Sequence, residues 1–84
     1  MSYWVYILRS ERNGRYYTGF SADPSRRLQE HNDGKVKGTR YARPWTIVYV
    51  EQFEDETSAR RREYKLESMK SRVYLEALIS RWSR

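Results

Sequence analysis

Two short aromatic runs joined by an Asn-Gly pair constrain the fold of this chain more than any other feature. The runs are Trp4-Val5-Tyr6-Ile7-Leu8 and Tyr16-Tyr17-Thr18-Gly19-Phe20. Aromatic and β-branched residues favour the pleated, half-buried surface of a β-sheet. Asn13-Gly14, which lies between the runs, favours the positive φ of a tight hairpin turn. The sequence therefore predicts a β-hairpin that brings Tyr6 and Tyr17 close together.

The predicted strands cover residues 3–9, 15–20 and 46–50. Because side chains alternate along a strand, Tyr6 and Leu8 of the first strand are expected on the face opposite Ile7. The third strand is almost entirely β-branched or aromatic, which is typical of a central strand covered on both faces. Gly19 is unusual inside a strand and marks either a close approach of another backbone or ligand, or a simple bulge.

Capping residues mark the start of each predicted helix. Asp23, followed by Pro24, begins a helix that ends at about His31 or Asn32, before Gly34. Thr57 or Ser58 begins a second helix, which continues to about Lys70. Ser71 begins the last helix. Asp, Ser and Thr accept hydrogen bonds from the first turn, Pro fits the first helical position, and Gly commonly follows the end. The last helix has an apolar face expected to pack on the sheet, formed by Tyr74, Leu75, Leu78, Ile79 and Trp82.

The length and composition limit the classes of protein to which this chain can belong. A chain of 84 residues predicts one domain, residues 1–84. The absence of cysteine excludes a disulfide framework, a thiolate zinc site and a thiol nucleophile. No apolar run approaches the ~20 residues of a membrane span, and the N-terminus lacks the basic and then apolar layout of a signal peptide. A cytoplasmic protein is therefore expected.

The charge of the chain favours phosphate-rich partners. Lysine and arginine number 17 against 11 acidic residues, which gives a net charge of +6. The segment 35–45 interleaves basic and aromatic side chains, namely Lys35, Lys37, Arg40, Tyr41, Arg43 and Trp45. Such a mixture suits a phosphate backbone and exposed bases. The alternative is an ordered connection whose aromatic residues simply pack inward.

Two of the predicted helices carry residues that could take part in catalysis or ligand binding. Arg27 and His31 are four residues apart and share one helix face. The second predicted helix has a stripe formed by Ala59, Glu63, Leu66 and Lys70, so Glu63 is in line with residues that should face the sheet. A carboxylate there is costly unless a cation, a metal or hydrogen-bond donors satisfy it. The structural alternatives are a solvated Arg27, a His31 cation at the helix C-terminus and a buried Glu63–Arg27 ion pair.

In their order and spacing these residues resemble the GIY-YIG nuclease family, in particular its small stand-alone bacterial members. The matching segments are Trp4-Val5-Tyr6, Tyr17-Thr18-Gly19, Arg27 with His31 and Asn32, the connection 39–45, and Glu63 four residues after Ala59. The resemblance extends from Trp4 to about Ile79. Three strand positions of the family motifs differ, at Trp4, Val5 and Thr18, and Glu67 stands where relatives often have lysine. The added DNA-recognition domains of larger relatives are not expected in this chain.

The resemblance implies an α+β fold, with a three-stranded antiparallel sheet flanked by helices in the order β-β-α-β-α-α. It also implies an endonuclease that uses Mg²⁺ or Mn²⁺. Glu63 would hold the metal, and Arg27 would neutralise charge at the phosphorus centre. Tyr6 or Tyr17 would take the proton of the attacking water, with a pKa lowered by the metal and by Arg27. His31 would act as a second base or hold the tyrosine in place.

The expected substrate is DNA, with RNA as a further option. The nucleic-acid-binding residues would be Arg26, Lys35, Lys37, Arg40, Tyr41 and Arg43. A domain this small has little surface for reading a long sequence, so selectivity for DNA structure or strand state is expected, in repair or recombination. A partner protein is one source of specificity. Two competing hypotheses are a nucleic-acid-binding module whose catalysis is weak or lost, and a small interaction protein with a satisfied Glu63–Arg27 pair.

Overall fold

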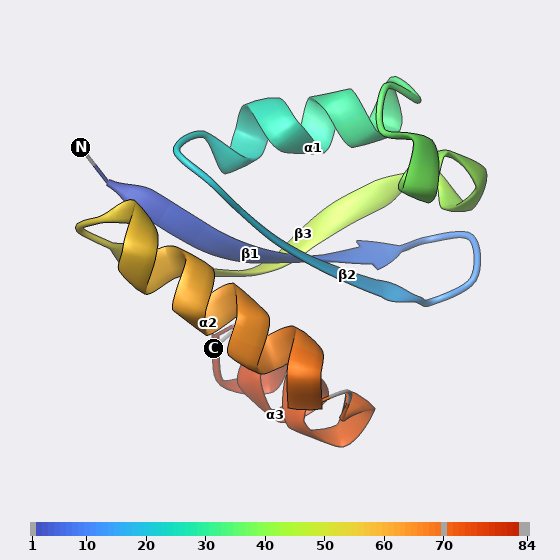
Figure 1. Cartoon of the computed structure of the whole chain (residues 1–84). Coiled ribbons are helices and arrows are strands. Elements are labelled where there is room, and N and C mark those ends of the chain that lie inside the picture. Colours follow the sequence, from blue (N-terminus) through green and yellow to red (C-terminus); the bar gives the residue numbers. More distant parts are fainter. Residues whose placement is uncertain (1, 70, 83–84) are drawn as a thin grey trace.

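A computed structural model of the chain describes residues 2–69 and 71–82. Within these residues the elements are β1 (Tyr3–Ser10), β2 (Tyr16–Ser21), α1 (Pro24–Asn32), the 3₁₀-helix η1 (Lys37–Ala42), β3 (Trp45–Phe53), α2 (Glu56–Met69) and α3 (Arg72–Trp82). The three strands form one antiparallel sheet, with α1 on one side and α2 and α3 on the other (Figure 1). The predicted α+β fold is confirmed. None of the described helices combines the length and apolar character needed to cross a membrane.

β1 and β2 form the predicted hairpin around Asn13-Gly14. The two strands pair from Trp4 opposite Ser21 to Arg9 opposite Tyr16. In the turn, Ser10 Oγ accepts hydrogen bonds from the backbone N–H groups of Arg12 and Asn13, at 3.1 Å each. Gly14 has a φ of +76°, a conformation that glycine adopts without steric cost. The Asn-Gly pair therefore has the role that the sequence predicted for it.

β3 is an edge strand, whereas its apolar run predicted a central one. The strand order is β2-β1-β3, so β1 is central, and among the described strands β3 pairs with β1 alone. β3 is also longer than the predicted 46–50, since it covers Trp45–Phe53. The prediction of a central third strand is therefore wrong.

A bulge explains why β3 is nearly continuously apolar. Its register with β1 shifts between Ile7 and Leu8. Tyr49 pairs with the first of these and Ile47 with the second, which leaves Val48 as an extra residue. Ile47 then packs on one face of the sheet, whereas Val48 and Tyr49 pack on the other. The alternation of faces reverses at the bulge, so consecutive residues of this edge strand contribute to different cores.

The central strand contributes to both cores, as the alternation of its side chains predicted. One core beneath α1 and η1 contains Tyr6, Leu8, Ala42 and Trp45. The other, beneath α2 and α3, contains Val5, Ile7, Tyr49, Ala59 and Leu66. The four residues from β1 are at most 1% exposed, and burying an apolar side chain of this size contributes about 1.5–3 kcal/mol. The predicted apolar face of α3 packs on the second core through Tyr74, Leu75, Leu78 and Ile79.

The helix caps confirm α1 and α3 and correct α2. The predicted caps Asp23 and Ser71 accept hydrogen bonds from the backbone N–H groups of Arg26 and Tyr74, at 3.1 Å in both cases. The cap of α2 is Asp55, whose Oδ1 accepts the N–H of Ser58 at 2.7 Å, and not Thr57 or Ser58. A carboxylate is favoured at this position because it also interacts with the positive end of the helix dipole. α2 therefore begins earlier than predicted, at Glu56.

Gly19 marks a close approach, and the group that approaches it is the side chain of Tyr6. The two residues are regular partners across the hairpin, so the alternative of a bulge at Gly19 is wrong. A Cβ atom at position 19 would lie 2.6 Å from Oη and 2.7 Å from Cζ of Tyr6. Tyr6 is only 1% exposed, so its ring has no solvent to move into. Glycine at this position therefore makes room for the Tyr6 hydroxyl.

Gly19→Ala is expected to lower the free energy of unfolding by about 1–3 kcal/mol, the usual cost of overpacking a filled site. Gly38→Ala is the matched control, because a Cβ atom there meets nothing within 4 Å. Urea denaturation of both variants measures the difference. Equal stability of the two would contradict the tight packing of Tyr6 against Gly19.

Candidate active site

Three predicted residues from three elements form an aromatic cluster beneath α1. Tyr6 and Tyr17 point to the same face of the sheet, because Tyr17 is two residues from Gly19, the partner of Tyr6. Their ring centroids are 6.4 Å apart. The ring of His31 lies 4.8 Å from that of Tyr17 and 6.4 Å from that of Tyr6. The hairpin and α1 thus bring together residues that are distant in sequence.

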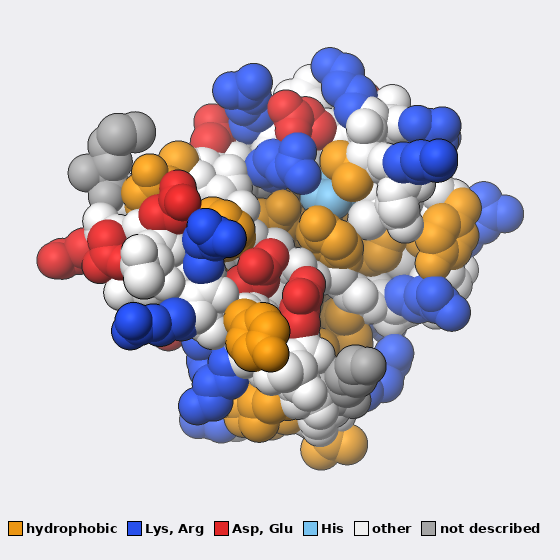
Figure 2. Space-filling model, in the orientation of Figure 1, with side chains coloured by type: hydrophobic (Ala, Val, Ile, Leu, Met, Phe, Trp, Pro, Cys, Tyr) orange, Lys and Arg blue, Asp and Glu red, His pale blue; other side chains and the backbone are white. Residues whose placement is uncertain are grey.

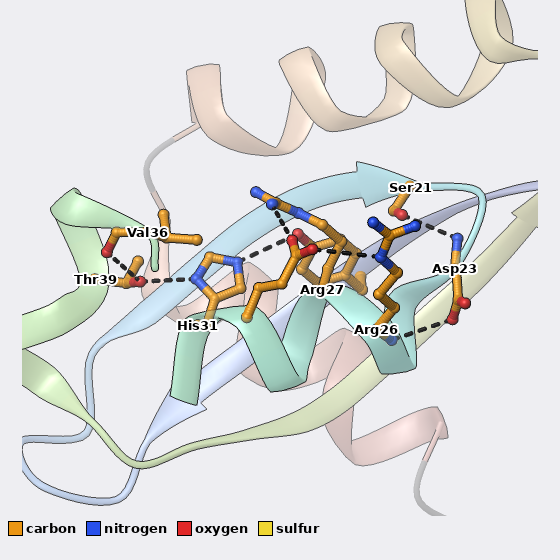
Figure 3. Close-up of polar contacts among 9 residues, drawn as sticks. Ser21, Asp23, Arg26, Arg27, His31, Val36 and Thr39 are labelled. Carbon is orange, nitrogen blue, oxygen red and sulfur yellow. Dashed lines mark hydrogen bonds and ion pairs between the residues drawn. The ribbon is translucent and has the colours of Figure 1, made fainter. Parts of the chain in front are cut away.

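Arg27 lies one helical turn before His31 and interacts with both tyrosines. Burial raises the pKa of Tyr6 and of Tyr17, and the positive charge of Arg27 opposes this shift. Its Nη1 also donates a hydrogen bond of 2.6 Å to Glu30, which in turn pairs with Arg26 at 3.4 Å (Figure 3). Glu30 was not expected in the site, although its spacing of three and four residues from the two arginines is typical of helix ion pairs.

His31 is buried and neutral. It is 0% exposed, its Nδ1 lies 2.7 Å from Oγ1 of Thr39, and its Nε2 lies 3.5 Å from Oη of Tyr6. Burial, followed by the nearby charge of Arg27, holds the pKa of His31 below its usual value, so the imidazole is uncharged at neutral pH. The alternative of a His31 cation at the end of the helix is therefore wrong.

Burial raises the pKa of both tyrosines above the usual range for a phenol. Desolvation is the largest cause for Tyr6 and for Tyr17, and it outweighs the opposing effect of Arg27. This direction is opposite to the lowered pKa that was expected for a tyrosine acting as a base. Both side chains are consequently protonated at neutral pH in the protein alone. A phenol in this site can accept a proton only if it passes its own proton to another group.

Glu63 approaches this cluster from α2, which lies on the opposite side of the sheet from α1 (Figure 1). α2 packs against β2, which is an edge strand. After burial, the charge of Glu63 contributes to the raised pKa of Tyr6 and Tyr17, so its carboxylate is within electrostatic range of both phenols. The candidate site therefore spans the β2 edge. On this surface acidic side chains lie beside apolar and basic ones (Figure 2).

Glu63 is partly buried and, among the described residues, has neither a hydrogen bond nor an ion pair. Its pKa is raised, first by burial and then by the charge of Glu67. The suggested ion pair with Arg27 is wrong, because Arg27 pairs with Glu30. The stripe residues Ala59 and Leu66 are buried as predicted, and Lys70 lies outside the described residues.

These properties of Glu63 suit a divalent cation that completes its shell with water and substrate oxygens. In the part of the chain that the structure describes, no cluster of three or more His, Cys, Asp or Glu residues could enclose a metal. Mg²⁺ does not need such a cluster, since it keeps several waters and is commonly bound by one or two carboxylates together with substrate phosphates. A partly buried carboxylate that has no partner among the described residues fits this mode of binding.

Four of the six predicted nucleic-acid-binding residues line one open hollow of about 550 Å³ beside η1. Its lining consists of Arg12, Asn32, Lys37, Arg40, Tyr41, Arg43 and Pro44. The other two predicted residues are exposed at the two ends of α1, Arg26 in its first turn and Lys35 just beyond its last. Arg12 was missed because it belongs to the hairpin turn, and only the folded topology brings that turn next to η1.

The connection between α1 and β3 is ordered, but only part of it packs inward. Arg40 and Arg43 each donate Nε–H to a backbone carbonyl at 2.8 Å. Trp45 is 4% exposed, whereas Tyr41 is 56% exposed and its hydroxyl accepts a hydrogen bond from Arg15 at 2.9 Å. The hollow therefore presents an aromatic ring and several cations on a fixed backbone.

Asn32, the last residue of the helix motif, has a structural role. Its Oδ1 accepts the backbone N–H of Trp45 at 2.7 Å, and its Nδ2 donates to the carbonyl of Trp45 at 3.0 Å. The side-chain amide thus pairs with the start of β3 as a neighbouring strand would. This pairing fixes the end of α1, and with it His31, over the sheet.

Comparison with known proteins gives consistent matches along the chain. The family model described as the GIY-YIG catalytic domain matches residues 2–75. A UPF0213 protein of Halobacterium salinarum is 41% identical over 76 residues, covering 89% of this chain and 96% of the relative. A UPF0213 protein of Staphylococcus aureus is 37% identical over 68 residues, covering 80% and 82%. The solution NMR structure of a UPF0213 protein from Bacillus halodurans is 37% identical, has a TM-score of 0.59 and covers 95% of this chain and 84% of its own.

The matched region includes every element that contributes to the candidate site, from β1 to α2. The relatives are of similar length to this chain, and one of them is a solved structure with the same fold. The resemblance inferred from the motifs is therefore confirmed, and the chain belongs to the GIY-YIG family of nuclease domains.

Proposed function

We propose that this protein is an endonuclease that hydrolyses DNA phosphodiester bonds with the help of Mg²⁺ or Mn²⁺. The observation that supports the proposal is the cluster of two phenols and a neutral imidazole beneath Arg27, with the unpaired carboxylate of Glu63 within electrostatic range across the β2 edge. Membership in a nuclease family gives the class of reaction. Each of these groups then has a task that its chemistry and surroundings suit.

Arg27 binds the phosphate that is cleaved. Its planar fork matches phosphate oxygens and stabilises the negative charge that grows on them as the P–O bond to the leaving group breaks. The phosphate replaces Glu30 as the acceptor for some of the Arg27 N–H groups. Glu63 holds the divalent cation, which when bound polarises the phosphate and stabilises the leaving oxygen.

Tyr6 and His31 receive the proton of the attacking water. The phenolate form of Tyr6 is scarce because burial raises its pKa, so the phenol gives up its own proton as it accepts one. Neutral His31, with Nε2 at 3.5 Å from the Tyr6 hydroxyl, is the acceptor. The water oxygen bonds to phosphorus, its proton passes to Tyr6, and the proton of Tyr6 passes to His31. Tyr17 packs against the imidazole and faces Arg27 and Glu63, where it borders the phosphate.

Glu63→Gln and Arg27→Lys are each expected to reduce metal-dependent cleavage by about 10²–10³-fold, because each removes an interaction with charge that develops in the transition state. Glu54→Gln is the matched control, since Glu54 is an exposed acid before α2. Labelled single-stranded, duplex, flap and four-way-junction DNA are incubated with each protein in Mg²⁺, in Mn²⁺ and in chelator. Single-turnover rates provide the comparison.

Cleavage that needs metal and is lost in both site variants would support the proposed site. Cleavage that persists unchanged in Glu63→Gln would contradict it and would point to a contaminating nuclease. Binding of DNA without cleavage, unchanged in both variants, would favour the hypothesis of a binding module.

The hollow beside η1 binds the DNA backbone next to the cleaved phosphate. Its cations Arg12, Lys37, Arg40 and Arg43 suit phosphates, and the exposed ring of Tyr41 suits a base that is not stacked in a duplex. A surface of this size covers only a short stretch of DNA. We therefore propose selectivity for DNA structure or strand state, in repair or recombination, with a partner protein adding specificity.

Replacing Lys37 and Arg12 together by alanine is expected to weaken DNA binding and to reduce the slope of log K against log salt by about 2, since each phosphate that is no longer neutralised accounts for about 0.9. Neither side chain has a hydrogen bond or ion pair within the described residues, so the fold should be unaffected. Arg81→Ala is the control, because Arg81 is exposed on α3, across the sheet from η1. Fluorescence anisotropy over a range of salt concentrations gives the slopes. If Arg81→Ala reduced the salt slope by the same amount per charge removed, net charge alone would explain the effect and binding in the hollow would be contradicted.

A further inference from the structure

Thr39, in the 3₁₀-helix η1, is a buried partner of His31 that the proposed mechanism does not yet use. It is 3% exposed, and its Oγ1 lies 2.7 Å from Nδ1 of His31. Figure 3 shows this contact and the next one, in which the Thr39 hydroxyl donates to the carbonyl of Val36 at 3.4 Å. The hydroxyl oxygen is therefore available to accept a hydrogen bond from the imidazole.

The position of Thr39 is fixed from both sides of η1. Its backbone N–H donates to the carbonyl of Val36 at 3.2 Å. Its carbonyl accepts a hydrogen bond of 2.9 Å from the indole Nε1–H of buried Trp45 in β3. The hydroxyl thus has a defined place relative to His31 before any substrate binds.

The surroundings of Tyr6 independently select one tautomer of His31. The guanidinium of Arg27, whose side chain carries donors only, is the charged group that acts on the Tyr6 hydroxyl from α1. If Nε2 of His31 were also protonated, the buried Tyr6 hydroxyl would face donors, and its own proton would have no acceptor among the described residues. With the proton on Nδ1, Tyr6 donates to Nε2 and Nδ1–H donates to Thr39. All the polar atoms are then satisfied, as buried groups normally are.

We propose that Thr39 is a positioning residue of the proposed nuclease site, which holds His31 in the tautomer protonated at Nδ1 so that Nε2 can receive the proton of Tyr6. This inference rests on the proposed function for its catalytic part. The tautomer itself is a property of the free protein and is measured without substrate.

Other groups around His31 do not provide this control. The titratable and charged groups that face it are Tyr6 from β1, Tyr17 from β2, and Arg27 and Glu30 from α1. None of these gives Nδ1 a hydrogen-bond acceptor among the described residues, whereas Thr39 does so at 2.7 Å. Loss of the Thr39 hydroxyl therefore leaves a buried N–H without a partner, and the imidazole is expected to populate both tautomers.

The chain contains one histidine, so the imidazole ¹⁵N signals of tag-free protein need no assignment. In the unmodified protein they should show a protonated Nδ1 and an unprotonated Nε2. Thr39→Val keeps the shape of the side chain without its hydroxyl and should shift the signals toward a mixture of tautomers. Thr39→Ser keeps the hydroxyl and should restore the pattern. Cleavage should fall about 10–100-fold in Thr39→Val, within the range of a general-base contribution, and recover in Thr39→Ser.

Two results would overturn the role of Thr39. One is a proton on Nε2 in the unmodified protein, a measurement that does not depend on whether Thr39→Val folds. The other is full cleavage activity in a folded Thr39→Val variant whose tautomer has changed. Absence of cleavage by the unmodified protein under all metal conditions would instead overturn the proposed function, and the NMR result would still decide the tautomer.

Discussion

The pairing of β1 with a strand on each side is the constraint on which the rest of the structure depends. Because β1 is buried on both faces, its alternate residues must fill two cores, and a polar residue among them needs internal partners. Tyr6 is that residue. Its hydroxyl fits only because Gly19 has no side chain, and its hydrogen-bond partner is His31 from α1. The hydrogen-bonding requirement of one core residue thus fixes one half of the candidate site.

The other half comes from the opposite side of the sheet. Glu63 lies on α2, and it meets the α1 side of the sheet at the edge formed by β2. This division places the carboxylate that we propose for the cation and the guanidinium that we propose for the phosphate on two different helical layers. In the proposed site a phosphodiester bound between them would lie across the β2 edge, and the hollow beside η1 would supply further cations for its neighbours.

Local signals made much of this predictable from sequence. Asn13-Gly14 specified the hairpin, and the spacing of Arg27 and His31 placed both on one helix face. The edge position of β3 was not predictable, because a bulged strand that serves two cores has the same apolar composition as a central strand. The neutral state of His31 and its contact with Thr39 depend on burial beneath η1, and residue spacing carries no information about that. Arg12 joins the hollow only through the folded hairpin.

The location of the bound cation is the most direct test of the proposed active site. Mn²⁺ is added to ¹⁵N-labelled protein together with a DNA oligonucleotide whose linkages resist cleavage, and paramagnetic broadening of the backbone signals is mapped. If Glu63 holds the cation, the broadening should be strongest around Glu63, with Tyr17 and Arg27 next. Broadening centred on Asp55, the acid at the start of α2 and about 12 Å away along the helix, would contradict it.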